Sequence, residues 1–257
     1  DRRSIVSLLA MYESLIRYIP RFALWVCCMD EKSYSILSEM NIPNLILLDS
    51  KNIEVDDLNN VMLSWGKDRY INLIKSGLSY FILKNNHSVE KLLYLDPDIY
   101  FFSDPSMLFE AWQEGCIFVH RFPVTSEVKK PFEIFHSGLV GLLRKEGTLY
   151  FLEDCVRACK NNSYYDMPLA DYYGIRQVED MAANADIYML RLLLPELKKD
   201  LICVNFRDLK SLRIIMQLLE RNLSTLSKNQ ELKRICETYI KSLREAYLKL
   251  KSLGKDH

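Results

Sequence analysis

The chain has 257 residues, of which 49% are hydrophobic and 26% charged, so it holds enough apolar material for one substantial core and a small appendage. It carries 34 basic and 34 acidic side chains, and this balance argues against a nucleic-acid partner. No apolar run reaches the roughly 20 residues that span a bilayer, and the given sequence does not open with the basic segment and apolar segment of a signal peptide. We therefore expect a soluble protein with one main domain and an extension.

The seven cysteines form neither a CxxC pair nor the spacing of a metal finger. Several of them lie in apolar runs, as Cys27 and Cys28 do after Leu24-Trp25-Val26. This pattern predicts buried, reduced thiols and hence a reducing compartment. The expected location is cytoplasmic, with peripheral membrane contact as an open addition.

Helical and strand patterns alternate along the first hundred residues. Apolar residues recur at helical spacing over 4–18, and a continuous apolar and aromatic run follows at 22–29. The pattern continues with a helix at 31–40, a strand at 45–48, a helix at 56–84 and a strand at 91–95. This alternation predicts an α/β fold with a mostly parallel sheet, which binds ligands beyond the carboxyl ends of its strands. Asp30 and Asp96 both stand at such an end.

The next segment is predicted to contain a helix at 105–113, strands at 117–119 and 138–143, and a helix at 147–160. The loop 123–133 is polar and contains two prolines, and 161–174 is rich in tyrosine. The tyrosines of that segment either stack on an acceptor or serve as core and loop anchors. They are Tyr164, Tyr165, Tyr172 and Tyr173.

The chain changes character after residue 206. Residues 207–257 carry 12 Lys and Arg against 6 Asp and Glu, a net charge of +6. Their apolar residues recur at helical spacing, and no proline interrupts them. We therefore divide the chain into a main domain, 1–206, and a helical extension, 207–257. Six apolar residues of the extension follow a seam close to a heptad repeat: Cys236, Tyr239, Leu243, Ala246, Leu250 and Leu253. An ordinary solvated helix, a docking face for anionic lipid, a homodimer or partner seam, and a lid on the main domain all remain open.

Two carboxylates follow directly on the strand at 91–95, in the segment Asp96-Pro97-Asp98. Pro97 fixes the backbone between them, so the two acids share one small volume at the carboxyl end of the strand. A hard divalent cation offsets both charges and accepts oxygen ligands from both. The same cation stabilises the charge that develops on a diphosphate leaving group. A bare DxD is also compatible with a capped, solvated loop.

The residues around this motif form the string 93–105, Leu-Tyr-Leu-Asp-Pro-Asp-Ile-Tyr-Phe-Phe-Ser-Asp-Pro. It resembles the signature of GT-A glycosyltransferases related to family 8 and their bacterial relatives. The resemblance implies a GT-A, Rossmann-like fold with a mixed, mostly parallel sheet flanked by helices. It also implies transfer of a sugar, of the hexose class, from a UDP-sugar to an acceptor that is a glycan, lipid or protein. Asp96 and Asp98 would hold Mn²⁺ or Mg²⁺, and Tyr94, Leu95 and Asp96 would line the nucleotide-sugar site.

More distant segments extend the resemblance on the nucleotide side. The strand predicted at 22–29, which ends just before Asp30, looks like the uridine-binding strand of these enzymes. An acid at this place is also a common helix N-cap. Lys67 and Arg69 look like a phosphate-side basic pair, or else lie on a solvated helix face.

The strand 117–121 and the segment 135–140 extend it on the sugar side. Phe135-His136-Ser137-Gly138 resembles the Phe-Asn-Ser-Gly segment of the family. His120 and His136 would therefore line the donor pocket with Ser137 and Gly138, whereas a lone histidine is more often structural.

The sequence departs from the family where the reaction itself is expected. In Gly174-Ile175-Arg176-Gln177 the glutamine is retained, but Arg176 replaces the expected acid. Glu179 or Asp180 would then supply the carboxylate beside Gln177, and retaining and inverting mechanisms both stay open. The alternative is a non-catalytic sugar-nucleotide binder or scaffold on the same fold. A phosphohydrolase with a nucleophilic aspartate is disfavoured, because Tyr100 stands two residues after the second acid.

Overall fold

The computed structural model describes residues 1–53, 67–111, 117–121, 135–161, 175–177, 184–186, 203–206 and 230–255. Its helices in this range are α1 (Ile5–Ile16), α2 (Glu31–Met40), α4 (Lys67–Asn85), α5 (Ser106–Ala111), α6 (Glu146–Asn161) and α10 (Gln230–Ser252), with short 3-10 turns at Arg2–Ser4 and Ser50–Asn52. Its strands are β1 (Leu24–Cys28), β2 (Leu45–Asp49), β3 (Lys91–Leu95), β4 (Ile99–Phe101), β5 (Ile117–Arg121), β6 (Phe135–Leu143), β7 (Ile175–Gln177), β8 (Asn184–Asp186) and β9 (Cys203–Asn205).

The described strands form three sheets, with the orders β1-β2, β3-β6-β5-β7 and β4-β9-β8. The predicted mixed α/β fold is confirmed, but the parallel share is smaller than predicted. The pairs β1-β2, β5-β7 and β8-β9 are parallel, and the pairs β3-β6, β5-β6 and β4-β9 are antiparallel. The reason is β6, which the sequence pattern did not orient: it runs opposite to both β3 and β5, and no described helix separates it from β5.

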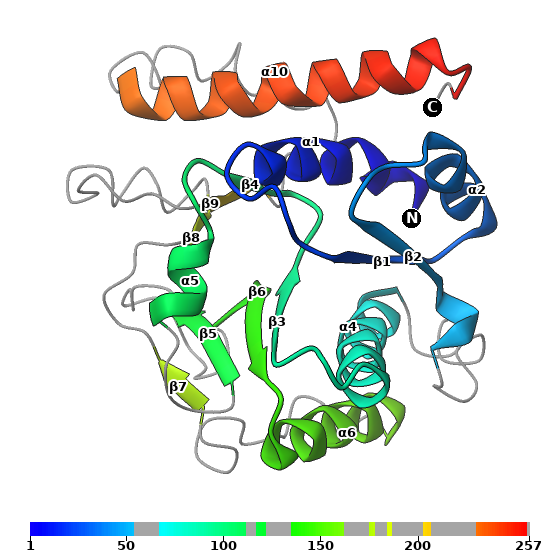
Figure 1. Ribbon diagram of the computed structural model, residues 1–257, viewed down its shortest axis with the longest axis vertical. Helices are drawn as coiled ribbons and strands as arrows, with labels where there is room; N and C mark the ends of the chain where they lie inside the picture. Colours follow the sequence, from blue (N-terminus) through cyan, green and yellow to red (C-terminus); the bar gives the residue numbers. More distant parts are fainter. Residues whose placement is uncertain are drawn as a thin grey trace.

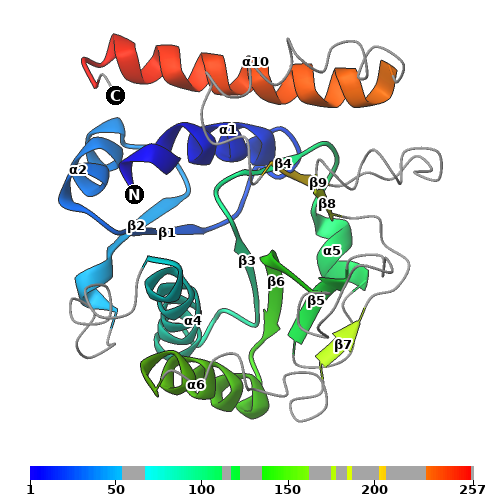
Figure 2. The ribbon, with the colours of Figure 1, turned by 180° about the vertical axis from the view of Figure 1, so that it is seen from behind.

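Helices cover the strands from two opposite ends of the molecule. α10 lies along α1 at one end, α4 lies beside α6 at the other, and β1 and β2 lie between α1 and α4 (Figures 1 and 2). β1 contributes to both layers by simple alternation. Leu24 and Val26 pack against the core cluster that contains α1, whereas Trp25 and Cys27 pack against the cluster of α4. The continuous apolar run at 22–29 accounts for this, because it supplies β1 with apolar side chains on both faces.

The seam of the C-terminal helix packs within this chain. Cys236, Tyr239, Leu243, Ala246 and Leu250 are all buried, and α10 contacts α1 along its length. Leu253, the last residue of the predicted seam, is half exposed beyond the end of α10. Of the interpretations of this helix, the structure supports packing against the main domain. The boundary at residue 206 stays a prediction.

Most predicted elements occur within a few residues of their expected positions. The N-terminal part of the helix predicted at 56–84, the end of the helix predicted at 105–113, the loop 123–133 and nearly all of the tyrosine-rich segment lie outside the described residues. Four strands were not predicted, namely β4, β7, β8 and β9. Each has only three residues, too few for an alternating or continuous apolar pattern to be recognised.

Five of the cysteines lie among the described residues. Cys27, Cys28, Cys155, Cys203 and Cys236 are thiols rather than disulfides, and four of the five are buried. Burial raises the pKa of Cys27 to about 12, so this thiol is protonated at neutral pH. Among the described residues, no helix has the length and apolarity that crossing a bilayer requires.

Candidate functional site

The DxD segment is a tight turn between two strands. β3 ends at Leu95, and the backbone N–H of Asp96 donates to the Gly138 carbonyl on β6 at 2.8 Å. The N–H of Ile99 donates back to the Asp96 carbonyl at 3.2 Å, which closes the turn over Pro97 and Asp98. β4 begins immediately afterwards. The backbone of the motif is therefore fixed from both sides, and Gly138 lies beside Asp96. A role of Gly138 in the donor pocket stays a prediction.

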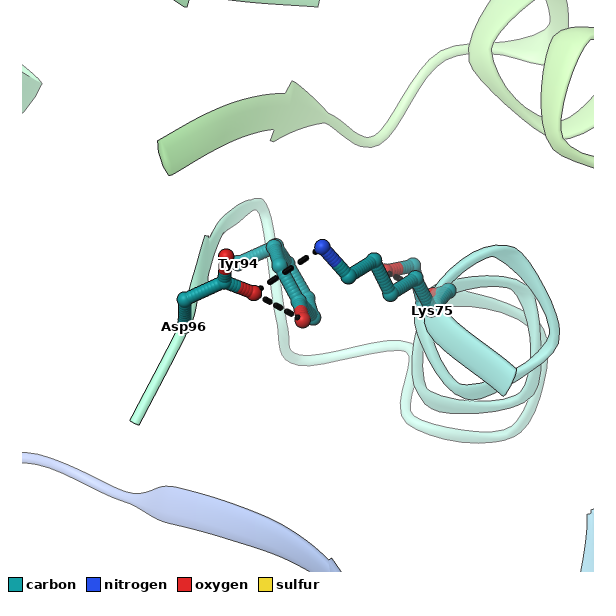
Figure 3. A network of polar contacts seen from close by, with 4 residues as sticks. Lys75, Tyr94 and Asp96 are labelled. Atoms are coloured by element: carbon teal, nitrogen blue, oxygen red, sulfur yellow. Dashed lines mark hydrogen bonds and ion pairs between the residues drawn. The ribbon is translucent and has the colours of Figure 1, made fainter. Parts of the chain in front are cut away.

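The side chain of Asp96 is held by one cation and one phenol. Its Oδ1 accepts a hydrogen bond of 2.7 Å from the Tyr94 hydroxyl and lies 2.9 Å from the Lys75 ammonium of α4 (Figure 3). The Lys75 Nζ also lies 5.1 Å from the centroid of the Tyr94 ring, a cation–π distance. The side chains of Lys75 and Asp96 are 19% and 16% exposed, so this ion pair is largely shielded from water.

Tyr94 keeps its proton in this arrangement. Burial raises the pKa of the Tyr94 phenol well above its ordinary value, and the charge of Asp96 and the hydrogen bond to it act in the same direction. The phenol is therefore a permanent hydrogen-bond donor to Asp96 at neutral pH.

Asp98 lies in a different environment, 3% exposed. Its backbone carbonyl accepts a hydrogen bond of 2.9 Å from the N–H of Phe206, just after β9. Phe206 stacks on Tyr239 of α10 with ring centroids 3.8 Å apart and planes at 9°. Burial raises the pKa of Tyr239, and the negative charge of Asp98 acts in the same direction.

The strand after Asp98 is fixed by α1 and α10. The Tyr100 hydroxyl shares a hydrogen bond of 2.9 Å with Ser242 of α10 and accepts one of 2.8 Å from the Arg17 guanidinium. The N–H of Phe101 donates to the Ser14 hydroxyl of α1 at 3.1 Å. Helices from both ends of the chain thus position the residues that directly follow the motif.

Several of the predicted site residues lie at the same edge of the four-stranded sheet. β3, β5 and β7 end at this edge, and β6 begins there. His120 of β5 is the register partner of His136 of β6, and Gln177 at the end of β7 is the partner of Val119. Together with Asp96 after β3, they come from four neighbouring strands. Ser137 lies on β6 between His136 and Gly138. Glu179 and Asp180 lie outside the described residues.

The nucleotide-side candidates lie on other elements. Asp30 is the N-cap of α2, where Oδ1 accepts from the Ser33 N–H at 2.8 Å and Oδ2 accepts from the Ser33 hydroxyl at 2.8 Å and the Arg2 N–H at 3.1 Å. Burial acts to raise the pKa of Asp30, but these hydrogen bonds outweigh it and lower the pKa. The capping interpretation is therefore realised, and a contact with uridine stays a prediction. Lys67 and Arg69 lie in the first turn of α4.

Comparison with known proteins gives the fold. No model of a protein family matches the sequence. Two curated relatives from Bacillus subtilis, the uncharacterized proteins YfnD and YfnF, are each 22% identical to this chain, over 206 and 165 residues. The matches cover 73% and 59% of this chain and 66% and 54% of the relatives, so the chain spans between half and two thirds of their length.

Solved glycosyltransferases superpose over most of the chain. GlyE from Streptococcus pneumoniae in its apo form matches with a TM-score of 0.54 and 17% identity, over 96% of this chain and 60% of GlyE. The galactosyltransferase LgtC, in complex with donor and acceptor sugar analogs, matches with a TM-score of 0.52 and 9% identity, over 80% of this chain and 84% of LgtC. This chain has the GT-A glycosyltransferase fold. The predicted fold is thus confirmed. Sequence identities this low support the fold and not a particular activity.

Lys75 contacts the motif but was not predicted from the sequence. The predicted cations were Lys67 and Arg69, in the first turn of α4, whereas Lys75 lies two turns further along. The neighbouring residues Leu73, Ile74 and Leu78 are buried against the strands. The sequence does contain a signal for Lys75: it is a lysine on the apolar face of the helix that precedes β3. A charged side chain at such a position needs a partner of opposite charge.

The donor set of the GT-A motif fits a hard divalent cation. Asp96 and Asp98 offer carboxylate oxygens on both sides of Pro97, and oxygen is the ligand type that Mg²⁺ and Mn²⁺ prefer. Among the described residues there is no cluster of three or more His, Cys, Asp or Glu side chains that could hold a metal. Two protein carboxylates with substrate phosphates and water completing the shell are typical of Mg²⁺.

Proposed function

We propose that this protein is a metal-dependent glycosyltransferase that moves a sugar, of the hexose class, from a UDP-sugar to an acceptor. The observation that carries the proposal is the position of Asp96-Pro97-Asp98 on a GT-A fold. The motif stands at the sheet edge where His120, His136 and Gln177 also lie. GT-A neighbours such as GlyE and LgtC are named as glycosyltransferases, which supports the same class of reaction for this chain.

The residues of the site would divide the work of the transfer. Asp96 and Asp98 would hold Mn²⁺ or Mg²⁺, whose bound form supplies a Lewis acid that offsets charge on the departing diphosphate. Tyr94 donates to Asp96 and holds its Oδ1 in place. Gln177, at the end of β7, would contact the reacting sugar, with Glu179 or Asp180 as the carboxylate nearby. His120, His136, Ser137 and Gly138 would line the donor sugar.

Removal of the second acid tests this proposal most directly. In Asp98→Asn, which keeps the shape of the buried side chain, we expect metal-dependent transfer or hydrolysis of the UDP-sugar to fall at least about 10²-fold, the scale of losing a preorganised electrostatic group. A thermal-shift screen of UDP-sugars with and without Mn²⁺ identifies the donor for this assay, because binding to the native state raises its stability.

Asp104→Asn is the matched control. Asp104 is an exposed acid in the next connection, between β4 and α5, and its carboxylate accepts a hydrogen bond of 2.8 Å from the Ser106 N–H. This variant should keep full activity. Full activity of Asp98→Asn would reject the assignment, as would a screen in which no uridine donor shifts the melting temperature.

Arg176 favours a second candidate, a sugar-nucleotide-binding protein without transferase activity. It lies on β7 beside Gln177, where the family resemblance expected an acid, and its register partner is Phe118. This candidate predicts that calorimetry detects UDP binding while no donor is turned over. Detection of any transfer or hydrolysis product dismisses it.

A further inference from the structure

Lys75 places a positive charge at the first acid of the motif before any metal is present. Its Nζ lies 2.9 Å from Asp96 Oδ1, and the same oxygen accepts the Tyr94 hydroxyl at 2.7 Å. Oδ1 is therefore engaged by two donors, and Oδ2 is the oxygen left for a metal. Because the site is largely shielded from water, the ammonium and a divalent cation on the same carboxylate would repel each other strongly.

Lysine suits a charge that changes partners. Its ammonium is a compact point charge on a flexible four-carbon stem, so it can leave a carboxylate for a phosphate without movement of the helix. The face of the Tyr94 ring, 5.1 Å away, supports the cation in its present position. A metal-bound diphosphate arriving at this edge would bring negative charge that the ammonium can pair with.

We propose that Lys75 is an exchangeable counter-ion: it neutralises Asp96 in the metal-free protein and transfers to the diphosphate of the donor when the metal and donor bind. This rests on the proposed function. It makes Lys75 a residue with two opposite effects. Lys75 weakens the binding of the metal alone, by competition for Asp96, and strengthens the binding of the nucleotide diphosphate once the metal is in place.

Binding measurements on Lys75→Gln test both effects without an activity assay. In the full chain, Mn²⁺ titrated alone and followed by electron paramagnetic resonance should bind roughly tenfold more tightly to the variant than to the wild type, because a competing charge is gone. UDP titrated in calorimetry at saturating Mn²⁺ should bind roughly tenfold more weakly, because a charge-assisted phosphate contact is gone. A residue that merely supports the structure would not move the two affinities in opposite directions.

Two further variants complete the design. Lys84→Gln is the matched control, because Lys84 lies on the same helix with its Nζ 5.2 Å from the Tyr80 ring centroid, and we expect both affinities to stay unchanged. Lys75→Arg keeps the charge and should retain the weak binding of Mn²⁺ alone.

The outcomes separate this inference from the proposed function. If wild-type protein binds Mn²⁺ and UDP but Lys75→Gln changes neither affinity, or changes both in one direction, the counter-ion role is wrong and the proposed function stands. If the wild type binds neither Mn²⁺ nor UDP, the proposed function fails and the counter-ion role fails with it.

Discussion

The two acids of the motif are separated by a single proline and yet belong to different parts of the molecule. Asp96 is 16% exposed in its side chain and is held by polar partners from the strand and helix just before it, Tyr94 and Lys75. Asp98 is 3% exposed and lies near aromatic residues from the C-terminal half of the chain, Phe206 and Tyr239. One carboxylate is partly exposed and paired with a cation, and the other is almost fully buried.

This difference teaches that a short motif can depend on both local and distant sequence. The partners of Asp96 are 2 and 21 residues away, inside the predicted helix–strand unit. Tyr100, in the segment after Asp98, contacts Ser242 and Tyr239, which lie 142 and 139 residues further along the chain. α10 contributes none of the predicted ligands, but it packs where it can position one of them.

The largest expected effect comes from removing the aromatic packing on the Asp98 side. Tyr239 is fully buried, stacks on Phe206 and meets Tyr100 edge-on with ring centroids 5.7 Å apart. Tyr239→Ala should lower the free energy of unfolding by about 3–5 kcal/mol, the range for truncating a large buried aromatic residue. Urea denaturation measures this, and Mn²⁺ affinity should fall in the same variant.

Tyr247→Ala provides a comparison on the same helix, because Tyr247 is only partly buried. We expect it to cost clearly less. If Tyr239→Ala cost as little as Tyr247→Ala, or if Mn²⁺ affinity were unchanged while stability fell, α10 would not position Asp98 and the contrast between the two acids would be lost.

A smaller effect is expected from the hydrogen bonds that join β4 to the two helices. Tyr100→Phe keeps the ring but removes the oxygen that bonds Ser242 and Arg17, and should cost about 1–2 kcal/mol. The neutral bond to Ser242 contributes roughly 0.5–1.5 kcal/mol, and the bond to Arg17 adds less than a buried charge-assisted bond because Arg17 is exposed. A double-mutant cycle with Ser242→Ala should give a coupling energy of about 1 kcal/mol. A coupling near zero would show that this contact does not link α10 to the motif.

The sequence predicted the Asp96 side better than the Asp98 side, for a physical reason. The β3 strand, its carboxyl end and the preceding helix follow from periodicity within one stretch of chain, and the structure confirms them. β4 has three residues and depends on contacts with α1, β9 and α10. No pattern within the sequence of β4 itself predicted this strand. The seam of α10 was visible in the sequence, but its partner α1 was not, because an apolar stripe does not specify what covers it.

The site shows the same limit. The family resemblance pointed to Asp96, Gly138 and Gln177, which lie at the same edge of the four-stranded sheet. The spacing of these residues in the sequence does not reveal that β6 runs antiparallel to its neighbours. Asp30 shows the opposite case. A residue at the expected sheet edge can be explained by the helix that it caps, and the local N-cap rule accounts for its bonds without a ligand.

The smallest expected effect comes from the Asp96 side, where Tyr94→Phe removes one donor and leaves Lys75 in place. At pH 7 this variant should lose about 0.5–1.5 kcal/mol of stability, the net value of one hydrogen bond. The loss should depend on pH in a defined direction. The pKa of the Tyr94 phenol is raised in the folded protein, so its contribution is complete below the ordinary tyrosine pKa of about 10 and declines as the pH rises above it.

Urea denaturation of wild type and Tyr94→Phe at pH 7, 9 and 10.5 measures this dependence. The stability difference between the two proteins should be equal at pH 7 and pH 9 and smaller at pH 10.5. Tyr80→Phe, which removes the hydroxyl of a partly buried tyrosine of α4, serves as the control for the loss of a phenol oxygen. A difference that grew with pH would mean that the folded protein favours the ionised phenol. Tyr94 would then not be a lasting donor to Asp96, and Lys75 alone would hold that carboxylate.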